Sequence, residues 1–232
     1  MKIIKADRSI IPACDVATLE TLDKLVRETC DVKGIGGYKI GFELVIPFGM
    51  KSVIHTIRMH TELPIIYDHQ KAGTDIPDTG EKFMKACKGV DAVILFPQAG
   101  PETERRWIEA AQKEGLGVII GGEMTHPKYL ESDGGFIRNS APQAIYELAA
   151  SLGVSDFVVP GNKPERIAEY KRTLETKGVK PVFYSPGMIT QGGDISDAAR
   201  AAGKEWHAII GRALYQASDM RGKAEEFARK VT

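Results

Sequence analysis

The sequence predicts an α/β protein that folds as one closed TIM-type (β/α)8 barrel, with residues 1–232 forming a single domain. Short apolar runs alternate with longer segments of helical period, a pattern typical of buried parallel strands and the helices that cover them. Eight such units share 232 residues, which gives 29 residues to each unit. That is the size of one strand with its helix. No linker, low-complexity segment or change in composition interrupts the alternation.

The predicted strands are short and almost entirely apolar, as expected for strands buried on both faces. They are expected at residues 9–14, 37–42, 64–67, 91–96, 116–121, 156–159, 181–184 and 207–211. A doubly wound open sheet is the main alternative. Because that fold usually has a glycine-rich turn after its first strand, and residues 14–17 contain no glycine, the closed barrel is favoured.

The predicted helices follow these strands and carry start and stop signals. Helical period occurs, among other places, over residues 17–29, 78–88, 102–114, 141–152, 164–176 and 213–231. Proline and acidic residues at 101–104 and 164–165 suit the free amides and the dipole of a helix start. Gly115, Gly153 and Gly178 fall where helices are expected to end.

Composition and charge exclude several classes of protein. Hydrophobic residues make up 43% of the chain, which excludes disorder, and 31 basic residues balance 31 acidic ones, which leaves no basic footprint for nucleic acid. The apolar runs are far shorter than the roughly 18 residues of a membrane span. The first residues lack the apolar region of a signal peptide, so we expect a cytoplasmic location. Cys14, Cys30 and Cys87 have no paired spacing and are expected to be free thiols.

Polar and ionisable side chains collect after the predicted strands. In a barrel of this kind the chemistry is found at the carboxyl ends of the strands. The residues at those positions are Asp15, Lys39, Asp68, Lys71, Asp75, Glu123, Thr125, His126, Gln191, Asp194, Gly211 and Arg212. Because the strands behind them are apolar, this distribution indicates a functional site at the mouth of the barrel.

Lys71 lies between two aspartates, Asp68 and Asp75, just after the third strand. A lysine held between carboxylates stays protonated, so it can act as a general acid. Two carboxylates in one site would also raise the energy of a substrate carboxylate placed beside them, which would favour its departure. The alternative is a solvated loop that carries an ordinary ion pair.

Lys39 is a single charge inside an otherwise apolar strand. A buried lysine is unfavourable unless it is paired, so its side chain either extends outward between the helices or meets a carboxylate inside the barrel. Asp15, at the end of the neighbouring first strand, is the nearest candidate partner.

A third group of residues suits a phosphate. Pro186 and Gly187 follow the seventh strand, Gln191 begins a glycine-rich run, and Gly211 with Arg212 follows the eighth. Phosphate sites in such barrels frequently lie after strands seven and eight, where amides and a helix N-terminus face the anion. Arg212 would sit unfavourably at a helix start without an anion nearby, which favours a phosphate over a simple pair of glycine turns.

Together these motifs resemble the orotidine 5′-phosphate decarboxylase family over nearly the whole chain. The matching segments, in the family's order, are Asp15, residues 38–41, the block 68–79, residues 123–127, residues 186–187, residues 191–194 and residues 211–212. The resemblance implies conversion of orotidine monophosphate to uridine monophosphate and CO2 in de novo pyrimidine synthesis. It also implies that the enzyme is a homodimer and needs neither cofactor nor metal.

The resemblance further implies a role for each matching residue. Lys71 would protonate C6 of the pyrimidine, and Asp68 would lie against the substrate carboxylate and orient Lys71. Asp15 and Lys39 would bind the ribose and complete the charged array, in which Lys39 joins Lys71, Asp68 and Asp75 as a catalytic residue. Thr125 would hydrogen-bond the pyrimidine ring. The phosphate would be held by residues after the last two strands, namely Gln191, Arg212 and the Gly211 amide, with Pro186 and Gly187 beside them. Asp75, Ile76 and Thr79 would reach into the site of the partner subunit.

Two features depart from the family's pattern. The family has one residue between the first aspartate and the lysine, and two between the lysine and the second aspartate, whereas here two and three intervene. Residues three apart on a strand face opposite sides, so Asp68 and Lys71 converge only if the strand ends or bulges near residues 69–70. Thr125 stands where the family usually has serine, with the same hydrogen-bonding capacity and one extra methyl group.

Two other functions remain as alternatives. The related ketogulonate- and hexulose-phosphate branch uses a similar block with magnesium, but usually has an acid where this chain has Lys39. A barrel that binds a nucleotide without turning it over is the other alternative, if the altered spacing has displaced Lys71. His69 and His126 have no carboxylate partners at metal-ligand spacing, so no metal site is predicted.

Overall fold

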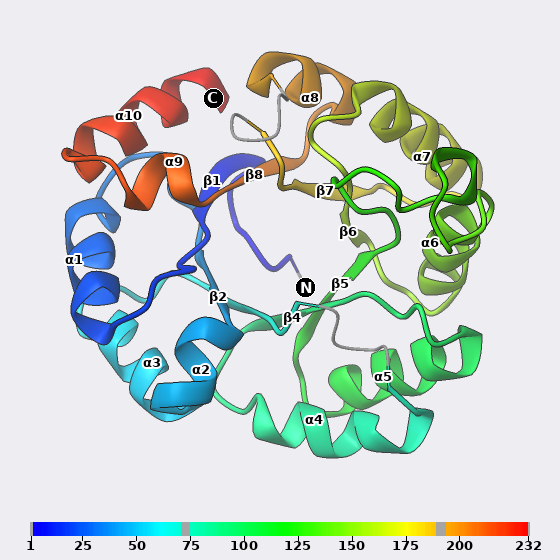
Figure 1. Ribbon diagram of the computed structural model, residues 1–232, viewed down its shortest axis with the longest axis horizontal. Coiled ribbons are helices and arrows are strands. Elements are labelled where there is room, and N and C mark those ends of the chain that lie inside the picture. Colours follow the sequence, from blue (N-terminus) through cyan, green and yellow to red (C-terminus); the bar gives the residue numbers. More distant parts are fainter. Residues whose placement is uncertain (1, 71–74, 189–193, 232) are drawn as a thin grey trace.

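The computed structural model describes residues 2–70, 75–188 and 194–231. Within these residues eight parallel strands form one sheet that curls into a barrel, and helices surround it (Figure 1). The strands pair in the order β1-β8-β7-β6-β5-β4-β3-β2. The predicted (β/α)8 barrel is therefore confirmed, and the open doubly wound sheet is excluded.

Every predicted strand overlaps an observed one, and the ends differ by at most two residues. The observed strands are β1 (Arg8–Pro12), β2 (Tyr38–Gly41), β3 (Ile65–Asp68), β4 (Ala92–Leu95), β5 (Gly117–Gly121), β6 (Asp156–Val158), β7 (Val182–Ser185) and β8 (Trp206–Ile210).

The helices agree less closely with the prediction. The structure has α1 (Leu19–Thr29), α2 (Phe42–Phe48), α3 (Met50–Arg58), α4 (Gly80–Ala86), α5 (Pro101–Lys113), α6 (Ala141–Ser151), α7 (Pro164–Thr176), α8 (Ile195–Ala202), α9 (Arg212–Tyr215) and α10 (Met220–Val231), with 3₁₀ turns η1 (Pro77–Thr79) and η2 (Glu131–Asp133). α2, α3 and α8 were not identified from the sequence. The sequence predicted that residue 42 belongs to the second strand, but this residue begins α2.

The prediction of one continuous helix over 213–231 is wrong. α9 ends at Tyr215 and α10 begins at Met220. Asp219 lies immediately before α10, and its Oδ1 accepts a hydrogen bond from the backbone N–H of Gly222 at 2.8 Å. A short carboxylate in this position satisfies a free amide of the helix start and so favours a new helix over a continuation. The predicted stops at Gly115, Gly153 and Gly178 are confirmed, since all three adopt positive φ after a helix.

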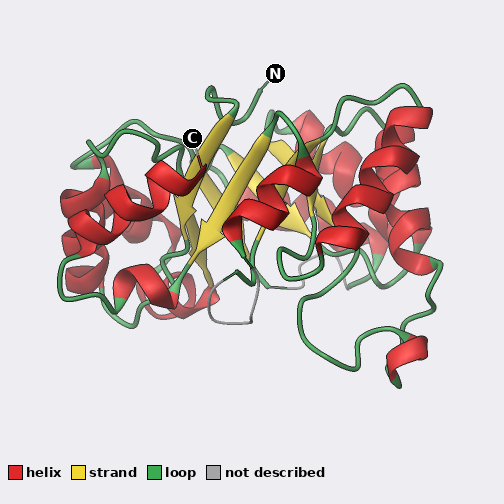
Figure 2. Cartoon of the chain, turned by 90° about the horizontal axis from the view of Figure 1, so that it is seen from above, coloured by secondary structure: helices red, strands yellow, loops and turns green. Residues whose placement is uncertain are grey.

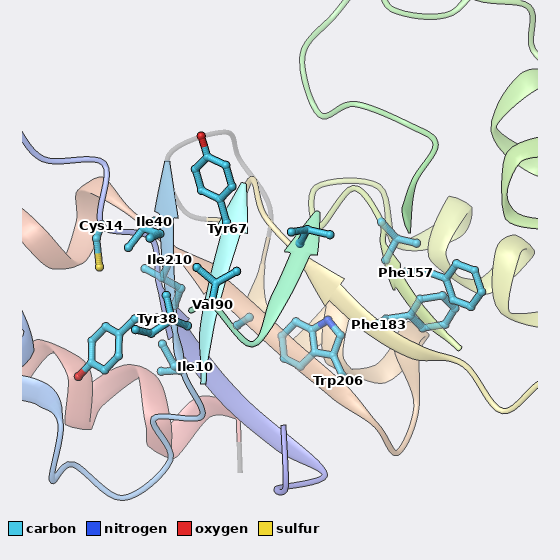
Figure 3. Close-up of a cluster of buried hydrophobic side chains, with 14 of the residues drawn as sticks. Ile10, Cys14, Tyr38, Ile40, Tyr67, Val90, Phe157, Phe183, Trp206 and Ile210 are labelled. Carbon is cyan, nitrogen blue, oxygen red and sulfur yellow. The ribbon is translucent and has the colours of Figure 1, made fainter. Parts of the chain in front are cut away.

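Side chains on the strands alternate between two buried clusters. One cluster lies between the sheet and the helices and includes Tyr38, Ile40 and Trp206, which Figure 3 shows with other members. The other fills the barrel and includes Ile66 and Ile94. Both faces of each strand are thus buried, which explains why the strands read as apolar runs. Lys39, between Tyr38 and Ile40, must face the barrel interior.

The barrel closes between β1 and β2 with few backbone bonds, a junction that we call the seam. Ile10 N donates to Gly34 O at 2.8 Å, Gly36 N donates to Ile10 O at 2.9 Å, and Cys14 N donates to Lys39 O at 2.8 Å. At the amino ends of the strands the N-terminal segment crosses the barrel, with Ile4 buried in the inner cluster (Figure 2).

Two further findings concern the described residues. All three cysteines are free, as predicted. Among the helices of the described ranges, none is long and apolar enough to cross a membrane.

Candidate active site

A cavity of about 280 Å³ opens at the carboxyl ends of the strands. It collects predicted site residues that are far apart in the sequence and come from six of the eight strand ends. These are Asp15, Lys39, Asp68, Thr125, Pro186, Gly187, Gly211 and Arg212. The barrel mouth therefore contains the charged group and the phosphate-type group in one pocket.

Lys39 lies between two carboxylates inside the barrel. Its Nζ is 3.1 Å from Oδ1 of Asp15 and 3.3 Å from Oδ2 of Asp68. The alternative in which Lys39 extends between the helices is wrong. Burial alone would lower the pKa of the Lys39 ammonium, but the charges of Asp68 and Asp15 and their hydrogen bonds outweigh it and raise the pKa. Lys39 is therefore a fixed positive charge at neutral pH.

β3 ends at Asp68, and the chain turns at once. Oδ1 of Asp68 accepts a hydrogen bond from the backbone N–H of Gln70 at 3.0 Å, and Gln70 has a φ of 45°. The strand thus ends before residue 70. With the spacing found in this chain, Asp68 and Lys71 can converge only if the strand ends or bulges near residues 69–70, so this requirement is met. Lys71 itself lies outside the described residues, as does Gln191.

Thr125 lies on the segment after β5, which side chains of the β6–α7 connection hold in place. Nδ2 of Asn162 donates to the Thr125 carbonyl at 3.1 Å, and Nζ of Lys163 donates to the Met124 carbonyl at 3.3 Å. Lys163 also pairs with Glu123 at 2.8 Å, and Arg166 pairs with Glu123 at 2.9 Å. These contacts fix the backbone on which Thr125 is carried.

Glu123 is a buried anchor of this segment. Burial tends to raise the pKa of its carboxyl, but hydrogen bonds from Lys163, Tyr170 and Arg166 lower the pKa below its ordinary value. The Glu123 carboxylate is already bonded to these three side chains. It serves to hold the β5 loop against α7, although its place in the sequence also suggested a functional group.

The part of the pocket that follows β7 and β8 has the features expected of an anion site. Gly187 has a φ of 86°, and Gly211 immediately precedes α9. Arg212 is exposed, and no carboxylate in the described part of the chain forms an ion pair with it. Arg212 therefore lines the pocket as a cation that has no ion-pair partner among the described residues.

Asp75, Ile76 and Thr79 do not line the pocket of their own chain. Their loop is fixed to α5: Oγ1 of Thr103 donates to the Asp75 carbonyl at 2.9 Å, and Nε1 of Trp107 donates to the Ile76 carbonyl at 3.1 Å. The Ile76 side chain is nevertheless 59% exposed. The loop that is hydrogen-bonded to α5 thus exposes the apolar side chain of Ile76.

Sequence reasoning missed several residues of the pocket. Its apolar wall consists of Ala13, Ile94, Phe96, Met124, Val158, Met188 and Ile209, and Gln70 and Tyr215 add polar groups. The inward positions on β4, β6 and β8 could have been found from the alternation along each strand. Gln70 and Tyr215 follow no such pattern. Over residues 2–70, 75–188 and 194–231, no group of three His, Cys, Asp or Glu side chains is arranged to hold a metal ion.

The family model described as orotidine 5′-phosphate decarboxylase / HUMPS family matches residues 8–227. The chain belongs to this family. The match covers all eight strands and every predicted site residue.

Individual members of the family are similar over almost their full length. Orotidine 5′-phosphate decarboxylase of Methanosarcina mazei is 33% identical over 229 residues, which cover 96% of this chain and 94% of that protein. The enzyme of Methanocaldococcus jannaschii is 30% identical over 216 residues, covering 93% and 94%.

Solved structures lead to the same family. The M. jannaschii orotidine 5′-monophosphate decarboxylase complexed with the inhibitor BMP superposes with a TM-score of 0.85 at 28% identity, covering 97% of this chain and 99% of that one. The Pyrococcus horikoshii enzyme gives a TM-score of 0.77 at 27% identity, covering 95% and 98%.

Proposed function

We propose that this chain decarboxylates orotidine 5′-phosphate to uridine 5′-phosphate and CO2 without a cofactor. The observation that carries the proposal is the Lys39 ammonium between Asp15 and Asp68, in a pocket that is also lined by Arg212, a cation with no ion-pair partner among the described residues. Relatives named orotidine 5′-phosphate decarboxylase, which are 33% and 30% identical over most of the chain, support the same activity.

The order of the strand ends orients the substrate. The phosphate binds after β7 and β8, at Arg212 and the Gly211 amide, with Gly187 and Pro186 beside them. Gln191, which lies outside the described residues, would add a hydrogen bond to the phosphate. β1 and β2 come next around the barrel, so Asp15 and Lys39 receive the ribose. Thr125, on the segment after β5, hydrogen-bonds the pyrimidine ring.

In the reaction the bond between C6 and the carboxylate carbon breaks. CO2 leaves, and the electron pair remains on C6. The Lys71 ammonium donates a proton to C6, which completes the product and leaves a neutral amine that regains its proton from solvent. Asp68 lies beside the substrate carboxylate, where like charge raises the energy of the bound substrate and is relieved when CO2 departs. The Lys39 ammonium, 3.3 Å from Oδ2 of Asp68, holds this carboxylate in position.

The site is completed by a second copy of the chain. Asp75, Ile76 and Thr79 do not line their own pocket, and the Ile76 side chain is exposed on a loop anchored to α5. In a homodimer these residues would enter the partner's pocket, where the Asp75 carboxylate would join Asp68 and Lys71.

The magnesium-dependent branch of the family is a weaker candidate. A divalent cation bound between Asp15 and Asp68 would have to displace the Lys39 ammonium, which already pairs with both carboxylates. The experiment that separates the functions is the ultraviolet absorbance of orotidine 5′-phosphate after addition of purified protein with a chelator present.

Loss of the orotate absorbance with chelator present is the expected result. Tight binding of the nucleotide without loss of absorbance would contradict the decarboxylase and support a nucleotide-binding barrel. If neither occurs, and a sugar phosphate is turned over only with magnesium, the magnesium-dependent branch would be correct.

A further inference from the structure

Gln70 has an unusual backbone for its residue type. Its φ of 45° is in the left-handed region, which residues other than glycine rarely adopt. The hydrogen bond from its backbone N–H to Oδ1 of Asp68 holds the turn. Backbone strain of this kind persists where the surroundings fix it, and it is concentrated at functional sites. The result here is that the Gln70 side chain lines the pocket two residues after Asp68.

The orientation of the Gln70 carboxamide follows from its neighbour. Phe42 begins α2, and its backbone N–H is one of the helix-start amides that lack a partner within the helix. Oε1 of Gln70 accepts from it at 3.3 Å. Since an N–H must face an oxygen, Nε2 lies on the other side. Within the described ranges no acceptor binds Nε2, so its two N–H donors are available to a ligand.

Gly41 provides the space for this arrangement. A Cβ at position 41 would lie 2.9 Å from Oε1 and 3.0 Å from Nε2 of Gln70, and 3.2 Å from Oδ1 of Asp15. Any larger residue would therefore displace one of the two side chains. Because both groups approach the same point, Nε2 of Gln70 and Oδ1 of Asp15 are within about 6 Å of each other.

We propose that Gln70 is a further specificity residue of the ribose subsite, where its Nε2 donates a hydrogen bond to one of the two ribose hydroxyls beside the Asp15 carboxylate. A carboxamide N–H is a pure donor and a carboxylate is a pure acceptor, and two adjacent hydroxyls can satisfy both at once. A sugar that lacks one hydroxyl leaves one of these groups without a partner in the pocket. The proposal rests on the proposed decarboxylation of orotidine 5′-phosphate, and it adds a specificity residue outside the family's pattern.

The test measures binding of uridine 5′-monophosphate and of its 2′-deoxy and 3′-deoxy analogues by calorimetry. The proteins are the full-length wild type and the variants Gln70→Gly and Gln70→Ala. Both variants lack the carboxamide, but only glycine adopts the left-handed backbone without strain. They should differ in stability and should nevertheless show the same change in sugar preference.

The expected result is that each variant weakens binding of the ribonucleotide by about 3- to 10-fold, as loss of one neutral hydrogen bond does, and leaves at least one deoxy analogue unaffected. An equal loss for all three nucleotides would overturn the proposal, as would a loss that follows the stability of the variants.

The outcomes also separate this proposal from the proposed function. If wild-type protein decarboxylates orotidine 5′-phosphate but the variants show no change in sugar preference, only the role of Gln70 is wrong. If wild-type protein neither binds uridine 5′-monophosphate nor turns over the substrate, the proposed function fails, and the ribose-recognition role of Gln70 fails with it.

Discussion

His207 predicts a specific loss of stability in mild acid. Its side chain is fully buried on β8, where Nδ1 is 2.8 Å from Oγ of Ser9 and the ring lies 4.9 Å from that of Tyr184. Nε2 is buried and has no hydrogen-bond partner among the described residues. Burial lowers the pKa of His207 to about 3 from an ordinary value of 6.5, and the charge of Lys2 adds to the effect.

The sign and size follow from proton linkage. The unfolded chain takes up a proton on His207 near pH 6.5, whereas the folded chain does so only near pH 3, so stability is present above pH 6.5 and is lost as the pH falls between these values. With RT of about 0.6 kcal/mol, the loss from this group between pH 7 and pH 5 is about 2 kcal/mol. Any folded-state pKa below about 4 gives the same figure, because the folded protein is then unprotonated at pH 5.

The assay is urea unfolding of the wild type and of His207→Asn at pH 7 and pH 5. Asparagine keeps a polar group near Ser9 and does not titrate. Other groups whose pKa differs between the folded and unfolded chain, such as Glu104 with its folded-state pKa raised by burial to about 8, contribute equally to the pH dependence of both proteins. The stability advantage of the wild type should shrink by about 2 kcal/mol between pH 7 and pH 5. Parallel pH dependences in the two proteins would show that His207 is not a buried neutral group.

Three further predictions concern the proposed reaction. Lys71→Ala should abolish turnover and leave binding of uridine 5′-monophosphate measurable by calorimetry; surviving turnover would show that another group protonates C6. Arg212→Ala should raise KM at least 30-fold, or about 2 kcal/mol, because the phosphate loses a charge-assisted contact; an unchanged KM would remove Arg212 from the phosphate site. Mixing Asp75→Ala and Lys71→Ala subunits should restore part of the activity, because some heterodimer sites contain both native residues. No recovery after verified subunit exchange would contradict a shared site.

The strands could be predicted because each is buried on both faces, so its sequence is a short apolar run with little else to confuse it. α2 could not, because it places Pro47 inside the helix and exposes 70% of Ile46, so it lacks the usual apolar face. Residue 42 was assigned to β2 for the same reason: an apolar residue after an apolar strand gives no signal that a helix has begun.

The site, like the fold, contains residues whose positions could be predicted from the sequence and others whose positions could not. Lys39 could be predicted because a charge inside an apolar strand needs a nearby partner, and the strand order supplies Asp15. The position of Gln70 could not, because it depends on a left-handed backbone and on an amide 28 residues away. The contacts of Asn162 and Lys163 with the Thr125 segment span 37 to 40 residues, and no periodicity in the sequence reports them.

The seam between β1 and β2 passes directly through the charged group of the site. Asp15 belongs to one side of it, and Lys39 and Asp68 belong to the other. A local opening of the seam would separate the Asp15 carboxylate from Lys39 and leave the pairing of β2 with β3 intact. We expect the integrity of the site to be governed by the free energy of this local opening, which can be smaller than that of global unfolding. Hydrogen exchange at the Cys14 and Gly36 amides would measure it, since both bond across the seam.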